Sequence, residues 1–192
     1  MNAASLAIFA LALAPVALAQ PVSAEHAPPP SLDLPAKIAP VAGPVGPLGR
    51  QVAFAAPGST ITVPAGIYRE HLVIDHPVTL LAQPGAILDG DGHGDIVQIT
   101  APDVTLRGFV IRNTGVDLDQ ENAGIRVTAP RATIQDNVLE DILFGIDLRD
   151  SPDSRVVGNR IGGKALDIAR RGDGLRLWRA DRALVERNTI HD

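Results

Sequence analysis

The chain has 192 residues, no cysteine and a formal net charge of −5. The length suits one domain of ordinary size, and the lack of cysteine excludes a disulfide framework or a thiolate metal site. No block of Lys and Arg is present, which argues against a nucleic-acid partner and against an anionic membrane surface. Aromatic residues make up 3% of the chain, so the core has to be built from Val, Ile and Leu.

The N-terminus resembles a secretory signal. Residues 6–14 form an apolar run that is too short to span a bilayer, and Ala17-Leu18-Ala19 is a small-x-small cleavage pattern. The positive n-region of a typical signal is missing, and an apolar core helix is the alternative interpretation. We predict a signal peptide over residues 1–19, a periplasmic protein, and no transmembrane segment after cleavage.

Residues 20–48 are predicted to form a Pro/Ala-rich linker, because their repeated prolines prevent a continuous helix or a central strand. Gly49 to Ala56 predicts a short capping helix that Pro57-Gly58 ends. The folded domain is expected over residues 49–192.

Short alternating strands recur beyond Ser59. One unit, with apolar residues two apart, repeats at residues 96–100, 124–128, 145–149 and 174–178. A second unit, apolar-x-x-Asn-x-apolar, follows each first one at a fixed distance. Its copies contain Asn137, Asn159 and Asn188, and Phe109 takes the place of Asn in an earlier copy.

Two insertions, at residues 116–122 and 164–173, interrupt the repeat near its corners, as loops of a solenoid do. The pattern predicts an all-β fold, a right-handed parallel β-helix whose stacked coils bury an aliphatic column. The three asparagines are expected to bond along the stack at the corners. A doubly wound α/β fold lacks its helices here, and a leucine-rich repeat would show a denser Leu pattern.

One loop could bind a cation. Asp91, His93 and Asp95 lie in an Asp-Gly-rich segment, and carboxylates with an imidazole are suitable metal ligands. Alternating Asp and Gly is also ordinary turn chemistry. A corner turn is the favoured interpretation, and a metal site that uses Asp91, His93 and Asp95 is the alternative.

Acid–base chemistry would need charged groups clustered on one face. Candidates are the insertion residues Asp117, Asp119 and Glu121, with Arg126, Asp147 and Arg149 on neighbouring strands. Cross-strand pairing offers a structural explanation, because Arg126, Asp147 and Arg176 occupy the same position in successive coils with alternating charge.

The segment Arg171-Gly172-Asp173-Gly174-Leu175-Arg176-Leu177-Trp178 is the most distinctive string. A tight turn entering a strand would explain it. An exposed Trp beside Arg is also a common interface anchor. We predict a partner-binding segment that uses Arg171, Asp173, Arg176 and Trp178.

These strings together resemble the NosD family of nitrous oxide reductase maturation proteins. The resemblance covers residues 55–192 and includes Pro57-Gly58-Ser59-Thr60, residues 64–68, 87–90 and 103–109, and most specifically residues 171–178. It implies a periplasmic β-helix of the CASH repeat type and a non-enzymatic role. The implied partners are subunits of an inner-membrane ABC transporter and nitrous oxide reductase or a copper chaperone.

Copper is the cofactor that the resemblance implies, through assembly of the copper–sulfur centre. Family members have several more coils, so C-terminal coils are expected to be missing here. The alternatives are a polysaccharide lyase or epimerase, supported by the acidic insertion, and a structural β-helix fragment.

Overall fold

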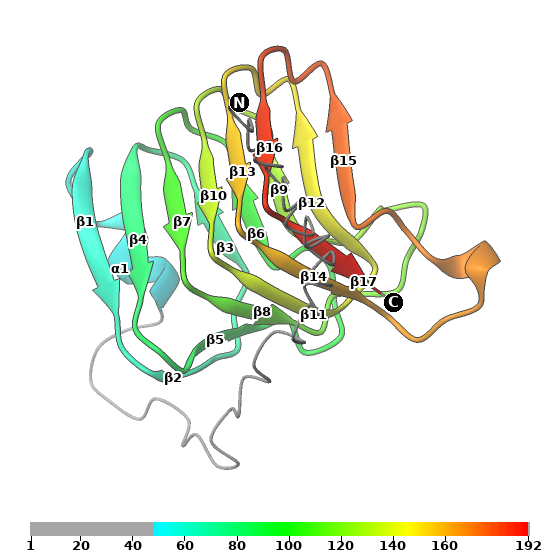
Figure 1. Cartoon of the computed structure of the whole chain (residues 1–192). Helices are drawn as coiled ribbons and strands as arrows, with labels where there is room; N and C mark the ends of the chain where they lie inside the picture. Colours follow the sequence, from blue (N-terminus) through cyan, green and yellow to red (C-terminus); the bar gives the residue numbers. More distant parts are fainter. Residues whose placement is uncertain (1–47, 192) are drawn as a thin grey trace, which may run out of the picture. The chain divides into compact units, whose positions relative to one another are not determined.

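The computed structural model describes residues 48–191, which form a parallel β-helix with one short helix at its start (Figure 1). The predicted signal peptide over 1–19 and the linker residues 20–47 lie outside the described residues. None of the helices within 48–191 is long and apolar enough to cross a membrane.

The strands form three parallel sheets. The first sheet contains β1 (Ser59–Val63), β4 (Val78–Ala82), β7 (Thr105–Arg107), β10 (Thr133–Gln135), β13 (Arg155–Val157) and β16 (Leu184–Glu186). The second contains β2 (Gly66–Tyr68), β5 (Ala86–Asp89), β8 (Val110–Arg112), β11 (Val138–Ile142), β14 (Arg160–Gly163) and β17 (Thr189–His191). The third contains β3 (Leu72–Ile74), β6 (Val97–Ile99), β9 (Ala123–Val127), β12 (Phe144–Arg149) and β15 (Leu175–Trp178).

Each coil contributes one strand to every sheet. In the described part of the chain, β1–β3 make the first coil, β13–β15 the fifth, and β16 with β17 part of a sixth. This arrangement confirms the predicted parallel β-helix. A 3₁₀ turn, η1 (Ile168–Arg170), lies in the insertion that projects from the stack between β14 and β15 (Figure 1).

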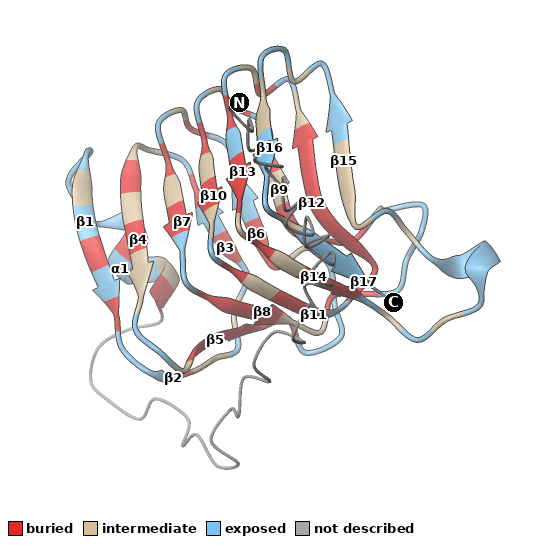
Figure 2. Ribbon diagram, viewed as in Figure 1, coloured by how far each residue is buried: buried red, intermediate tan, exposed pale blue. Residues whose placement is uncertain are grey.

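An aliphatic column fills the interior. In the third sheet Ile99, Val127 and Leu148 stand in register on successive strands and are fully buried. Figure 2 shows buried residues on strands of all three sheets, and β12 is buried along nearly its whole length. Burying one such side chain stabilises the fold by about 1.5–3 kcal/mol.

The helix α1 (Leu48–Ala53) covers the first coil. Its side chains Leu48 and Val52 are buried in the core. The backbone N–H groups of Leu48 and Gly49 donate to the carboxylate of Glu70 at 2.7 and 2.8 Å. These bonds satisfy donors that a helix start leaves open. The predicted capping helix is therefore confirmed, although it spans Leu48–Ala53 rather than residues 49–56, so Leu48 belongs to the helix and not to the predicted linker.

An asparagine ladder runs along one corner of the stack, as predicted. The side-chain oxygen of Asn159 accepts the backbone N–H of Asn137 at 3.0 Å, and that of Asn188 accepts the N–H of Asn159 at 2.8 Å. The side-chain amide of Asn159 donates to the carbonyl of Ile134 at 2.9 Å. Phe109, in the Asn-free copy, donates its N–H to Asn137 at 3.0 Å. The asparagines are structural.

Glycine begins three of the four copies of the first unit, at residues 124, 145 and 174, and at Gly145 the reason is steric. A Cβ built on Gly145 would lie 2.0 Å from the carbonyl oxygen of Gly174 and 2.8 Å from a methyl group of Ile161. At Gly145 the coils approach too closely for any side chain.

Candidate functional site

Six charged side chains gather on the outer face of the third sheet. We call them the charge cluster: Asp95, Glu121, Arg126, Asp147, Arg149 and Arg176. Three carboxylates face three guanidinium groups, so the formal charges sum to zero. Since β9, β12 and β15 are in register, their outward residues at one position are stacked on one another.

Asp147 is the centre of this cluster. Its side chain is 1% exposed, and it accepts hydrogen bonds from Arg149 at 2.7 Å and Arg176 at 2.9 Å. Arg126 in the preceding coil approaches to 3.6 Å. The predicted column of alternating charge is therefore confirmed. A buried carboxylate needs such partners, because an unpaired buried charge costs several kcal/mol.

Glu121 brings the first insertion into the cluster. Its carboxylate bonds to Arg149, and to Arg176 at 2.8 Å. Arg126 holds the same loop by donating to the carbonyl oxygen of Glu121 at 2.8 Å. The hydrogen bonds from Arg176 and then Arg149 lower the pKa of Glu121 from 4.5 to about 2.

This low pKa predicts a pH-dependent contribution to stability. A carboxylate whose pKa is lower in the folded than in the unfolded chain stabilises the fold above the unfolded value. That contribution is lost as the pH falls from 4.5 to about 2. Glu121→Gln is expected to lower the free energy of unfolding by about 1–2 kcal/mol at pH 7. The effect is limited because the ion pairs of Glu121 with Arg149 and Arg176 are partly exposed.

Urea unfolding of the Glu121→Gln variant and the parent protein between pH 7 and pH 3 measures this difference. It should shrink towards the acidic end. Asp119→Asn, an exposed change in the same insertion, is the control and should leave stability nearly unchanged at every pH. A pH-independent loss for Glu121→Gln would refute the electrostatic explanation.

The structure brings together four of the six residues considered for acid–base chemistry. Glu121, Arg126, Asp147 and Arg149 meet in the charge cluster, where each has an ion-pair partner. Asp117 instead accepts the N–H groups of residues 119 and 120, at 2.9 and 3.1 Å, which is a local turn. Proton transfer by the four residues of the charge cluster would require breaking their ion pairs.

Two of the predicted metal ligands, His93 and Asp95, line the same hollow, and Asp91 is not part of its lining. Asp91 lies in a left-handed turn with φ of 52° and donates its N–H to Asp89. Asp95 accepts Arg126 at 2.7 Å and the N–H of Ala123 at 2.7 Å. His93 lines an open hollow of about 500 Å³ together with Asp95.

Within residues 48–191 no group of three His, Asp or Glu side chains lies close enough to hold a metal ion. The donor chemistry of the described residues therefore does not fit a copper site with three side-chain ligands. The metal site at Asp91, His93 and Asp95 stays a prediction.

The predicted partner segment divides into an internal and an external part. Arg176 belongs to the charge cluster, and its guanidinium lies 4.8 Å from the ring centre of Phe144. Arg171 donates to the carbonyl of Leu166 at 2.6 Å, and the exposed Asp173 accepts the N–H of Gly145 through its backbone. Trp178 is 63% exposed.

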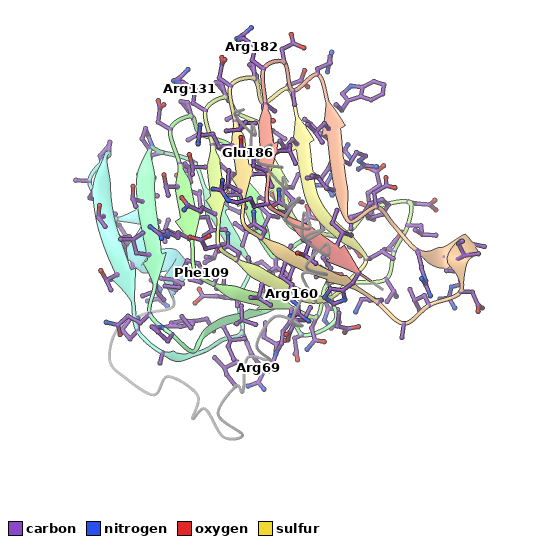
Figure 3. The ribbon with its side chains drawn as sticks, in the orientation of Figure 1. Arg69, Phe109, Arg131, Arg160, Arg182 and Glu186 are labelled. Carbon is purple, nitrogen blue, oxygen red and sulfur yellow. The ribbon has the colours of Figure 1, made fainter. Side chains whose placement is uncertain are left out.

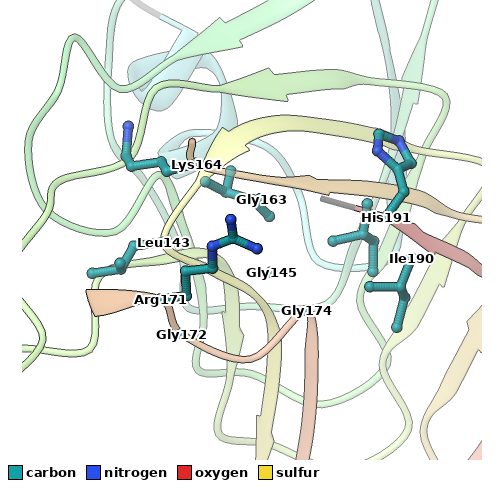
Figure 4. A pocket seen from close by; sticks show the side chains of 11 residues that line it. Leu143, Gly145, Gly163, Lys164, Arg171, Gly172, Gly174, Ile190 and His191 are labelled. Carbon is teal, nitrogen blue, oxygen red and sulfur yellow. The ribbon is translucent and has the colours of Figure 1, made fainter. Parts of the chain in front are cut away.

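Trp178 borders a second hollow of about 450 Å³, whose other lining residues are Glu121, Arg149, Asp150, Arg176 and Arg179. A smaller cavity of about 50 Å³ lies under the second insertion (Figure 4). The Lys164 ammonium beside it pairs with Asp141 at 2.9 Å.

A further charged ladder was missed by the sequence analysis. Asp103, Arg131, Asp153 and Arg182 occupy equivalent turns of successive coils, all with φ between 57° and 59°. Arg131 bonds to Asp103 at 2.7 Å and Arg182 to Asp153 at 2.6 Å. Figure 3 shows Arg131 and Arg182 along the same edge of the stack. The repeated small-Pro-charged triplets at 101–103, 129–131 and 151–153 were the available signal.

The fold and the outer charge cluster define a parallel β-helix protein with a polar face built from adjacent coils. No protein-family model matches the chain. It is similar to proteins described as "Probable ABC transporter binding protein NosD". The Pseudomonas aeruginosa (strain PAO1) protein is 37% identical over 129 residues, which cover 66% of this chain and 30% of that protein.

The Stutzerimonas stutzeri protein with the same description is 32% identical over 133 residues, which cover 68% of this chain and 30% of that protein. A further Pseudomonas aeruginosa sequence is 37% identical over 67 residues, which cover 35% of this chain and 62% of that sequence. The chain is NosD-like. It spans about 30% of the length of the first two relatives.

Proposed function

We propose that this chain acts as a periplasmic accessory protein in the maturation of nitrous oxide reductase, together with an ABC-transporter partner. The similarity to NosD proteins over about two thirds of the chain carries the proposal. The printed description of those relatives, as ABC transporter binding proteins, supports a binding rather than a catalytic role. Assembly of the copper–sulfur centre is the step it would assist.

The exposed Trp178 and the adjoining hollow support a partner contact on this chain. Aromatic residues beside arginine are enriched at the centres of protein interfaces. The proposed contact surface consists of Trp178 and the other residues that line its hollow. Arg176 lies on the same strand as Trp178 and anchors that strand to Asp147 of the preceding coil.

Gene replacement tests the proposal. In Pseudomonas aeruginosa, the aligned part of the resident NosD protein would be exchanged for this chain's matching segment. We expect export to the periplasm and restored reduction of nitrous oxide, with Trp178→Ala impairing the restoration. Accumulation of nitrous oxide despite an exported, folded chimera would refute the maturation role. Cleavage of a polysaccharide by the purified protein would favour the lyase or epimerase alternative.

Copper binding can be tested separately. Because Asp95 is engaged by Arg126 and Ala123, we expect Cu(I) and Cu(II) titrations to show only weak binding in the Asp-Gly loop. His93→Ala should weaken that binding further, because His93 supplies the imidazole of the loop. Tight binding by folded protein that His93→Ala abolishes would establish the predicted site and contradict this expectation. Circular dichroism is the folding control.

A further inference from the structure

An open hollow of about 500 Å³ lies on the outside of the second and third coils, between the Asp-Gly-rich loop and the first insertion. The first and fourth coils flank it through β3 and β12. Its volume falls within the range of about 300–1,000 Å³ that small-molecule sites occupy. We call it the amide hollow, after the side chains that give it its polar character: His93, Asp95, Gln98, Asp117, Gln120 and Asn122.

The backbone fixes the floor of the amide hollow. Gly115 donates its N–H to the carbonyl oxygen of Gly94 at 3.1 Å, which joins the two loops. A Cβ on Gly115 would lie 2.0 Å from the side-chain oxygen of Asn122 and 2.7 Å from the backbone nitrogen of Gly94, so a larger residue does not fit. The carboxylate of Asp95 adds a second link, because it accepts the N–H of Ala123 at 2.7 Å. The site is therefore largely pre-formed, as small-molecule sites usually are.

Asn122 has an unused donor at this floor. The residue is 7% exposed, and its side-chain oxygen accepts the N–H of Asp117 at 3.2 Å. Among residues 48–191 no acceptor bonds to its side-chain nitrogen. That nitrogen is not one of the polar atoms sealed from solvent, and Asn122 lines the hollow, so its N–H groups are open to the hollow. A nearly buried amide without a protein partner needs one from outside.

The rim supplies acceptors and further amides. Asp117 uses one carboxylate oxygen to accept the N–H groups of residues 119 and 120, and within the described chain its other oxygen has no hydrogen-bond partner. The amide nitrogen of Gln98 donates to Asp95 at 3.1 Å, which leaves the amide oxygen of Gln98 open. The exposed side chain of Gln120 makes no hydrogen bond within residues 48–191. Donors and acceptors are therefore both available to a ligand.

These groups select a neutral ligand that both donates and accepts hydrogen bonds. None of the described residues that line the hollow is Lys or Arg, and two are carboxylates, so an anion would be repelled. A simple ammonium offers donors alone and would leave the N–H groups of Asn122 without an acceptor. A hydroxyl group donates one hydrogen bond and accepts others, so it satisfies both kinds of group.

We propose that the amide hollow binds a neutral saccharide through its hydroxyl groups and does not cleave it. Glycoside cleavage uses a pair of carboxyl groups beside the bond, and here Asp95 is already held by Arg126 and Ala123. Asp117 is the other carboxylate of the described lining, and it stands without a second acid or base. Because the hollow is open, the dissociation constant should be on the order of 1 mM. The proposal goes beyond the accessory role proposed above and does not depend on it.

Nuclear magnetic resonance of the isotope-labelled full chain tests the proposal. The probes are the neutral disaccharides maltose, cellobiose and N,N′-diacetylchitobiose, with digalacturonate as the anionic comparison. We expect at least one neutral disaccharide to shift the side-chain amide signals of Gln120 and Asn122 saturably. Digalacturonate should bind at least about tenfold more weakly, because Asp95 and Asp117 repel it. No saturable shift with any neutral disaccharide, or equal binding of digalacturonate, would overturn the proposal.

Two variants locate the binding. Gln120→Ala removes an exposed side chain, so it should fold normally by circular dichroism and weaken binding about fivefold. Asn122→Asp keeps the oxygen that Asp117 uses and replaces the free N–H groups, so it should weaken binding at least about fivefold as well. Gln135→Ala, on β10 of the first sheet, is the matched control and should bind like the parent.

Unchanged binding by the folded Gln120→Ala variant, or an equal loss in Gln135→Ala, would show that the saccharide does not occupy the amide hollow. New reducing ends in disaccharides incubated with the parent protein would contradict binding without cleavage. The nitrous oxide readout uses no saccharide, so failure here is distinguishable from failure of the maturation role.

Discussion

Asn159→Ala is expected to lower the free energy of unfolding by about 3–5 kcal/mol, because it breaks the asparagine ladder at its centre. Asn159 is 1% exposed. Its oxygen accepts both the N–H and the side-chain amide of Asn137, and its own amide donates to Ile134. Without these bonds a buried donor and a buried acceptor lose their partners, and water cannot reach them.

Urea unfolding at pH 7, followed by far-UV circular dichroism, measures the loss. Asn188→Ala is the matched control, since Asn188 occupies the same corner but is half-buried, so water can replace its bonds. It should cost about 1 kcal/mol. Equal losses for the two variants would show that burial of the ladder is not what makes Asn159 important.

Asp147→Asn is expected to destabilise the protein by about 3–5 kcal/mol, as breaking a buried ion pair does. Arg126, Arg149 and Arg176 would then share only the carboxylates of Asp95 and Glu121, which leaves one positive charge unbalanced. Asp150→Asn in the same coil removes an exposed partner of Arg179 and should change stability little.

A double-mutant cycle tests the cause of this loss. Asp147→Asn combined with Arg176→Met restores the balance of charge, so the pair should cost less than the sum of its single changes. Thermal and urea unfolding of the parent protein, the two single variants and the double variant would give the coupling energy between Asp147 and Arg176. Strict additivity would indicate that Asp147 acts through packing and not through its charge.

Much of the fold was predictable because the same pattern of apolar residues recurs in successive coils. Alternating apolar residues gave most strands, and Asn137, Asn159 and Asn188 marked a corner that recurs in each coil. The strand β2 (Gly66–Tyr68) was missed, since it lacks the pair of aliphatic residues two positions apart that marks β3, which has the same length.

The candidate site was predictable only within the repeat. Arg126, Asp147 and Arg176 share a strand position, so their pairing followed from register. The contact of Glu121 with Arg176 joins residues 55 apart through an insertion, whose path no repeat specifies. The partner-binding prediction assumed an exposed Trp178, and this residue is 63% exposed in the structure.

The contact of Glu121 also affects how the stack opens. In an ordinary solenoid each coil interacts only with its neighbours, so end coils can open one at a time. Glu121, which leads into β9 of the third coil, bonds to Arg149 in the fourth and Arg176 in the fifth. It therefore fastens coils that are not adjacent. Amide hydrogen exchange should show the fourth and fifth coils protected as one cooperative unit, and Glu121→Gln should let them exchange separately.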